Sequence, residues 1–171
     1  METNPQPQHR WLEQLVGEWE VESEVVMAPG AEPTKLCGTE SVRSLGGLWV
    51  LCEGRCEMPG GGAGTTVMTL GFDPARGLFV GTFIASMMTH LWLYEGGLDP
   101  ELTVLTLDTE GPDPAGDGTI KRFQDIVTVE GGDRRTLASQ ALGEDGQWHR
   151  FMTARYRRIS WPDRVPGPTK S

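Results

Sequence analysis

Four titratable side chains stand in apolar segments of this chain, where each could orient or transform a small molecule. His90, in "MMTHLWLY", could act as a general base or as a ligand-orienting group inside an apolar cavity. Asp125, in "KRFQDIVTV", shares a strand face with Phe123 and could turn its carboxylate toward that cavity. Glu53 and Arg150 complete the set. The alternative role of each group is structural, as a core histidine, an exposed strand residue or one half of an ion pair.

Strand alternation decides which of these groups can point inward. In "LWVLCEGRCE", Glu53 and Arg55 share a face and form a charged pair either inside a lumen or on an outer wall. In "WHRFM", His149 and Arg150 occupy opposite faces, and Met152 lies on the same face as Arg150. We therefore expect Arg150 to point inward. A slip of one residue near a bulge would invert such an assignment.

Methionine and aromatic side chains could supply the apolar lining of a cavity. Methionine is unbranched and polarizable, so a cluster suits a pocket that adapts to an apolar ligand, and ordinary core packing is the alternative. With the four titratable groups, the residues expected to contact a ligand are Met68, Leu70, Met88, Trp92, Phe123 and Met152.

Motifs for metals, phosphates and cofactors are weak. The glycine-rich "EMPGGGAGTT" lacks the Lys-Ser/Thr ending of a phosphate-binding loop and precedes a strand, which favours a hairpin loop. Cys37, Cys52 and Cys56 form an odd set without a CxxC pair, which favours reduced, partly buried thiols. We expect no metal and no cofactor.

Composition narrows the partners and the location. The 171 residues carry a formal net charge of −9, so nucleic acid and anionic membrane surfaces would be repelled. No apolar run approaches the roughly 20 residues of a membrane helix, and the first thirty residues contain no signal-peptide core. We expect a cytoplasmic protein.

Turn residues divide the chain into short alternating runs, which is typical of an antiparallel meander. Sequential hairpins tend to close into an up-and-down β-barrel, because closure removes exposed strand edges. We expect an all-β fold with a single barrel domain over residues 1–158 and an extended or disordered tail over 159–171. The ten predicted strands span 18–27, 35–45, 48–57, 65–72, 77–86, 89–95, 101–109, 118–130, 134–142 and 147–158.

One short helix is predicted near residues 8–15, where Trp11, Leu12 and Leu15 share a face and Gly17 can end the helix. Such a helix can close one end of a barrel.

The stretch "GTFIASMMTHLWLYEGG", residues 81–97, is apolar on both faces of its two predicted strands. One set holds Ile84, Trp92 and Tyr94, and the other holds Phe83 and Leu93. Something must cover the outward set, and a homodimer pairing the wall formed by residues 81–95 is one cover. The N-terminal helix is the rival cover.

The order of a short helix, Gly17-Glu18-Trp19, a meander and the last strand "TARYRR" resembles the lipocalin and calycin barrels. That resemblance implies that Trp19 packs across the closed end, with Arg155, Arg157 or Arg158 stacked on it. "TLGFDPARGLFVGTFIASMM" and "WHRFMTARYRR" are more specifically similar to a bacterial lipocalin-like family described only as a domain of unknown function. This second resemblance implies the fold and brings no reaction with it.

Three functions fit such a barrel. The first is binding of a small apolar or amphipathic molecule in the lumen. The second is a metal-independent enzyme that uses His90 with Glu53 or Asp125 as acid and base. The third is a haem barrel resembling the nitrobindins, which would need a late histidine such as His149. "GEWEVES" lacks the further glycine of that family, which argues against haem.

Overall fold

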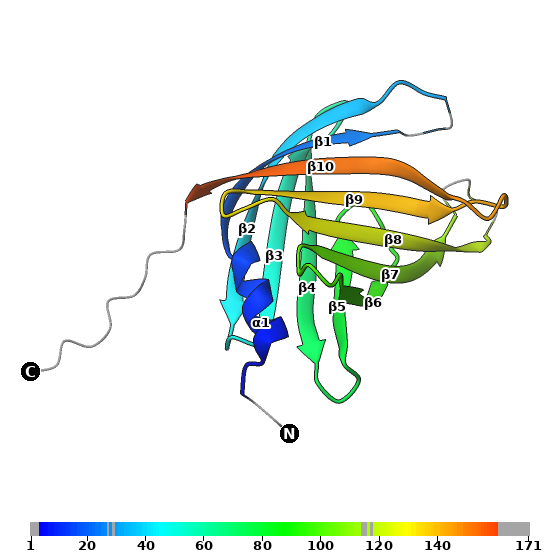
Figure 1. Ribbon diagram of the computed structural model, residues 1–171. Helices are drawn as coiled ribbons and strands as arrows, with labels where there is room; N and C mark the ends of the chain where they lie inside the picture. The colour runs from blue at the N-terminus through cyan, green and yellow to red at the C-terminus, as the bar shows by residue number, and fades with distance from the viewer. Residues whose placement is uncertain (1–3, 27, 29, 114–115, 117, 161–171) are drawn as a thin grey trace, which may run out of the picture.

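The structure, a computed structural model, describes residues 4–26, 28, 30–113, 116 and 118–160. A short α-helix and a 3₁₀ turn precede ten strands (Figure 1). The helical segments are α1 (Pro7–Leu12) and η1 (Glu13–Leu15). The strands are β1 (Gly17–Val25), β2 (Thr34–Leu45), β3 (Trp49–Glu57), β4 (Ala63–Asp73), β5 (Leu78–Ala85), β6 (Trp92–Leu98), β7 (Val104–Pro112), β8 (Ile120–Val129), β9 (Arg134–Leu142) and β10 (Trp148–Ser160).

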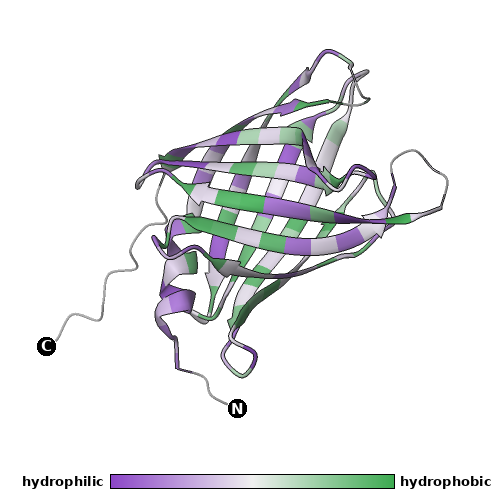
Figure 2. Cartoon of the chain, turned by 45° about the vertical axis from the view of Figure 1, so that its right-hand side comes forward, coloured by the Kyte–Doolittle hydropathy of each residue, from purple (hydrophilic) through white to green (hydrophobic). Residues whose placement is uncertain are grey.

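The ten strands form one closed antiparallel barrel in which each strand pairs with its neighbours along the chain. Pairing of β1 with β10, with Val21 opposite Tyr156, closes the sheet. Figure 2 shows hydrophobic and hydrophilic residues alternating along the strands, as expected when one face lines the interior. The predicted up-and-down barrel and its ten strands are confirmed. The last strand continues to Ser160, past the predicted boundary at residue 158. The predicted tail from residue 161 lies outside the described residues.

The helical segments close one end of the barrel. Pro7 occupies the first turn of α1, and the Gln6 and His9 side chains cap the helix reciprocally. The His9 ring also lies 3.1 Å from the carbonyl oxygen of Phe72 on β4, which ties the helix to the barrel wall. Gly17 then takes a φ of 138°, a conformation that glycine adopts readily, where the chain turns into β1.

Trp19 is almost fully buried at this closed end. Its indole N–H donates to the carbonyl of Leu15 at 2.8 Å, and the Arg158 guanidinium lies 4.0 Å from the ring centroid. Arg158 also donates to the carbonyls of Val16 and Gln14, which belong to the end of the helical segment. The cation–π pair implied by the lipocalin resemblance is therefore present, with Arg158 as the cation.

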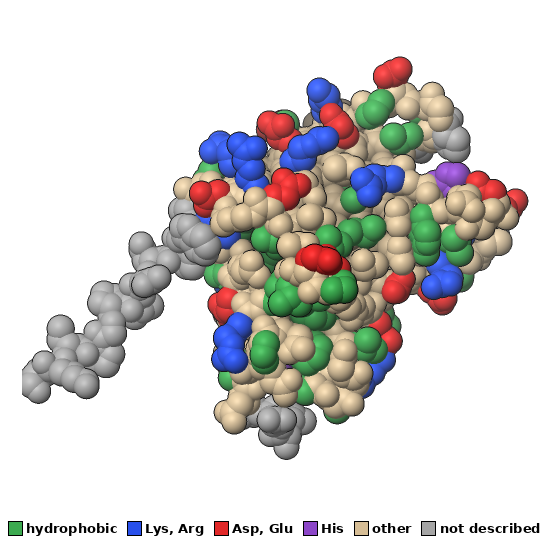
Figure 3. Space-filling model, viewed as in Figure 1, with side chains coloured by type: hydrophobic (Ala, Val, Ile, Leu, Met, Phe, Trp, Pro, Cys, Tyr) green, Lys and Arg blue, Asp and Glu red, His purple; other side chains and the backbone are tan. Residues whose placement is uncertain are grey.

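The two other candidate arginines of β10 face outward. Arg155 pairs with Glu24 and Arg157 with Glu20 across the seam between β10 and β1. Figure 3 shows the corresponding mixture of acidic and basic side chains at its upper left. These exposed ion pairs contribute little individually to stability.

A bulge in β10 changes the predicted orientation of one site residue. Arg150 lies opposite Gln140 and Met152 lies opposite Ser139, so Phe151 is an extra residue in this strand. The prediction that Arg150 points inward with Met152 is wrong, because the bulge reverses the alternation between them.

The two faces predicted for residues 81–97 are also partly wrong. Strand β5 ends at Ala85 and β6 begins at Trp92, so the alternation does not continue from one strand to the next. Phe83 lies opposite Trp92, and both side chains line the interior. Ile84 and Leu93 point outward and are 48% and 61% exposed. The homodimer expected from an exposed apolar wall stays a prediction.

Candidate ligand-binding cavity

The barrel encloses a cavity of about 760 Å³ that is lined by residues from all ten strands. Leu15 of η1 lies at one end, and the connection between β5 and β6 contributes Met87, Met88 and His90 to the wall. Cavities of about 300–1,000 Å³ with mostly apolar walls are typical of sites for one small molecule.

The alternation in each strand brings most of the predicted site residues together. Eight of the ten contribute to the wall of this cavity: Met68, Leu70, Met88, His90, Trp92, Phe123, Asp125 and Met152. Glu53 and Arg150 do not. Glu53 lies on the outer face of β3, half exposed, with its carboxylate 3.9 Å from Arg43, because the alternate residues Cys52 and Gly54 take the inward positions.

Asp125 is the most unusual polar group of the cavity. One carboxylate oxygen accepts a hydrogen bond of 2.5 Å from the Tyr94 hydroxyl on β6, and the other accepts one from Ser139 on β9. Burial raises the pKa of Asp125 above its ordinary range, although both hydroxyl donors favour the charged form and oppose that shift. Burial and the charge of Asp125 also raise the pKa of Tyr94.

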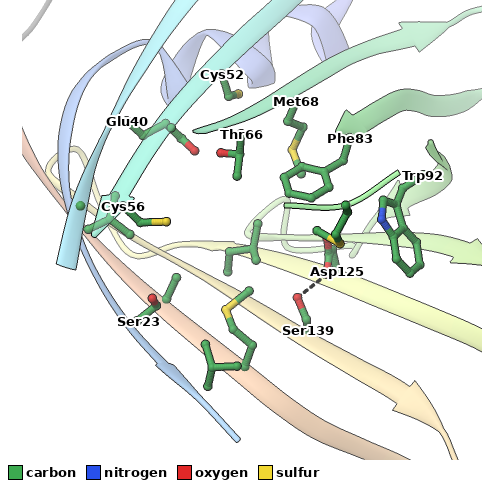
Figure 4. A pocket seen from close by; sticks show the side chains of 18 of the residues that line it. Ser23, Glu40, Cys52, Cys56, Thr66, Met68, Phe83, Trp92, Asp125 and Ser139 are labelled. Atoms are coloured by element: carbon green, nitrogen blue, oxygen red, sulfur yellow. Dashed lines mark hydrogen bonds between the residues drawn. The ribbon is translucent and has the colours of Figure 1, made fainter. Parts of the chain in front are cut away.

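Aromatic rings surround the side of the cavity that holds Asp125 (Figure 4). The Trp92 ring makes edge-to-face contacts with His90 and Phe123, with centroid distances of 4.8 and 5.1 Å. Gly111 on β7 makes room for this indole, because a Cβ there would stand 2.3 Å from a Trp92 ring carbon. The aromatic wall is therefore fixed in position by its neighbours.

A second polar group, not anticipated from the sequence, lies near the closed end. Arg135 donates a hydrogen bond to Glu40, and its guanidinium packs against the rings of Trp19 and Tyr156, at 4.7 and 3.7 Å from their centroids. Burial is the largest single influence on the pKa of Arg135 and lowers it, but the raising effects of Glu40, Tyr156 and Cys52 together are greater, so the pKa of Arg135 lies above its ordinary value. In the sequence, Arg135 stands at the same alternate positions as Leu137 and Ser139 of β9, and this pattern was the available signal that Arg135 points inward.

Among the described residues that line the cavity, three buried side-chain polar atoms have no hydrogen-bond partner. They are Trp92 Nε1, Thr109 Oγ1 and Arg135 Nε. Buried polar groups in native proteins are nearly always satisfied, so these three atoms are exceptions within this fold.

The two histidines considered for chemistry lie at different places. His90 borders the cavity, and its Nε2 lies 3.2 Å from the carbonyl oxygen of Glu110. His149, the candidate for haem ligation, is exposed, pairs with Asp145 at 2.8 Å and does not line the cavity. Among the described residues, no group of three His, Cys, Asp or Glu side chains could hold a metal ion, and all three cysteines are free thiols.

The raised pKa of Asp125 leads to a stability prediction. As the pH rises, an unfolded Asp125 loses its proton before a folded one, so folding is penalised above the unfolded pKa. The Asp125→Asn variant keeps an acceptor for Tyr94 and can donate to Ser139, so we expect it to be at least as stable as the wild type at pH 7. Each kcal/mol gained corresponds to about 2–4 °C in Tm for a protein of this size.

Differential scanning calorimetry between about pH 3 and pH 8 checks this prediction. The advantage of the variant should shrink toward low pH, where Asp125 is neutral in both states. If the variant loses stability relative to the wild type as the pH rises from 3 to 7, the ionised carboxylate stabilises the fold and the prediction is wrong.

Comparisons with known proteins agree with this architecture. The profile of one family, described as "Protein of unknown function (DUF1579)", matches residues 4–158. No protein of curated function matches the chain. The crystal structure of Rv2717c from M. tuberculosis is similar with a TM-score of 0.62 and 14% identity, over 92% of this chain and 100% of that chain. A redesigned β-barrel is similar at a TM-score of 0.48 and 10% identity, over 88% and 96% of the two chains. At 14% identity the likeness to Rv2717c concerns the fold alone.

Proposed function

Since the chain belongs to the DUF1579 family, whose function is unknown, we propose its function from the geometry of its own cavity. The protein binds one small apolar or amphipathic molecule inside the barrel. The proposal includes a cytoplasmic location, which rests on the sequence. Within the described residues, no helix has the length and apolar character needed to cross a bilayer.

The observation that carries this proposal is a cavity of about 760 Å³ whose mostly apolar wall contains a few polar residues, among them Thr109, Asp125 and Ser139. Met68, Phe83 and Met152 offer apolar contact area, and the Asp125 carboxylate, held by the hydroxyls of Tyr94 and Ser139, can orient a polar end of the ligand. This combination of apolar area with sparse polar groups is the pattern of small-molecule sites.

The enzyme alternative has less support. One of its two acid and base pairs requires Glu53, which lies on the outer face beside Arg43. The other requires His90 and Asp125, and each of these already has a different partner, the Glu110 carbonyl and the hydroxyls of Tyr94 and Ser139. Binding needs no such pair.

A cavity-filling variant tests the proposal. We expect the neutral dye N-phenyl-1-naphthylamine to bind the wild type with one-to-one stoichiometry and increased fluorescence. Ala154 is buried and lines the cavity, so Ala154→Phe should place a ring in the lumen and weaken dye binding by about tenfold or more. The neighbouring Thr153, which has the opposite parity on β10, provides the matched control Thr153→Phe. Equal dye affinity of the wild type and both variants would place the dye outside the barrel.

We also propose a homodimer formed through the wall of residues 81–95. Ile84, Leu91 and Leu93 are each about half exposed or more, and contact with a second copy would remove their apolar surface from water. Sedimentation equilibrium at micromolar concentration should give twice the monomer mass, and Leu93→Lys should shift the protein to monomer. If the wild type is monomeric, the proposed dimer is wrong, and the proposal of a ligand site in the cavity is unaffected.

A further inference from the structure

The charges inside the barrel do not balance. Glu40 pairs with Arg135, and Asp113 at the cavity edge lies 2.5 Å from Lys121. Arg55 on β3 also borders the cavity, but it is exposed to solvent and does not pair with Asp125. Among the described residues, Asp125 forms no ion pair, and its two hydrogen-bond donors are the neutral hydroxyls of Tyr94 and Ser139. The lumen therefore holds one carboxylate without a compensating cation.

The surroundings of Asp125 are suited to a cation. Tyr94 and Trp92 lie on the same inward face of β6. The Trp92 ring contacts Phe123, which precedes Asp125 by two residues on β8 and therefore shares its face. In Figure 4, Phe83 and Trp92 lie on the same side of the pocket as Asp125, and Glu40 lies across from them. Aromatic rings attract ammonium groups through their negative faces, and the attraction is stronger where water is excluded.

The interior arginine is not available to an anion. The Arg135 side chain is 4% exposed, is paired with Glu40, and is covered by the rings of Trp19 and Tyr156. A ligand carboxylate in the lumen would instead meet the unbalanced charge of Asp125. The cavity therefore disfavours anionic amphiphiles such as fatty acids.

We propose that the ligand is an amphipathic organic cation, a molecule with a protonated amine at one end and an apolar body at the other. The ammonium group binds at the Asp125 carboxylate within the aromatic wall, and the apolar body lies along Met68, Phe83 and Met152. This inference rests on the proposed binding function and adds the chemical class of the ligand. A charge-assisted hydrogen bond in a water-poor site is the interaction that separates such a ligand from a neutral one.

Three molecules with the same ten-carbon chain test this inference: decylamine, 1-decanol and decanoate. Each displaces N-phenyl-1-naphthylamine from the wild type at pH 7, and the competition gives its affinity. We expect decylamine to bind about tenfold or more tightly than 1-decanol, and decanoate to bind more weakly than both. In Asp125→Asn the preference for decylamine should fall to within about threefold, while the affinity for 1-decanol is retained.

The matched control is Glu53→Gln, which removes one negative charge from the outer wall. It should keep the preference for decylamine, and this separates binding at Asp125 from general attraction to an acidic protein. If 1-decanol or decanoate binds the wild type as tightly as decylamine does, or if Asp125→Asn keeps the full preference, the inference is wrong and the binding function stands. If neither the dye nor any of the three molecules binds, the proposed function itself is wrong.

Discussion

Replacing Trp19 with alanine is expected to lower the free energy of unfolding by about 3–5 kcal/mol, the range for truncating a large buried aromatic side chain. Trp19 is 1% exposed and joins the helical segment to the barrel through its hydrogen bond to the Leu15 carbonyl. Its ring is also the surface on which Arg158 and Arg135 stack. Removing the ring leaves a cavity at the closed end and uncovers both guanidinium groups.

Urea titration followed by circular dichroism measures this loss. Trp49→Ala is the matched control, because Trp49 lies on the outer wall and is 39% exposed. Its loss should be less than half that of Trp19→Ala. Similar losses for the two variants would show that the closed end does not depend on the stacked tryptophan.

The second large effect is expected at the buried ion pair. Glu40→Leu should cost about 3–5 kcal/mol, because it leaves the charge of Arg135 buried without its partner. The double variant Glu40→Leu/Arg135→Met should recover most of this loss, since replacing both members of a buried pair by apolar residues is often close to neutral. The same unfolding measurements give the coupling between the two sites.

A small loss for Glu40→Leu alone would contradict this account of the pair. So would a double variant that is destabilised by the sum of the two single losses, because the two side chains would then act independently.

The architecture could be predicted because it depends on local signals repeated along the chain. Turn residues separated the strands, and the period-two pattern indicated a closed barrel. The helix was predicted from the shared face of Trp11, Leu12 and Leu15, all of which are buried. The role of Trp19 came from the resemblance to lipocalin barrels, and the register of β1 with β10 places Arg158 beside it.

The candidate site was only partly predictable, because inward orientation depends on where alternation breaks. Asp125 and Phe123 lie within an uninterrupted strand, so the face that they share in the sequence pattern is also shared in the structure, where both line the cavity. Arg150 lies next to a bulge, which no local signal in "WHRFM" revealed. The partners of Asp125, Tyr94 and Ser139, come from strands distant in sequence, so their convergence depends on closure of the barrel and not on a motif.

The pair formed by Glu40 and Arg135 was missed for a similar reason. Arg135 follows Arg134 at the start of β9, where a pair of arginines after a turn suggests an exposed, charged hairpin. Glu40 stands 95 residues before its partner in the chain. Only the inward alternation of both strands, which places Glu40 between Gly38 and Val42 on β2, brings these charges together.

The most direct test of ligand binding inside the barrel is nuclear magnetic resonance of protein labelled with ¹³C in the methionine methyl groups. Met68 and Met152 line the cavity, whereas Met58 does not. With one equivalent of N-phenyl-1-naphthylamine, we expect nuclear Overhauser effects between the aromatic protons of the dye and the methyl groups of Met68 and Met152. Effects confined to Met58, or a bound dye without contact to any of the cavity methionines Met68, Met87, Met88 and Met152, would contradict a ligand site in the lumen.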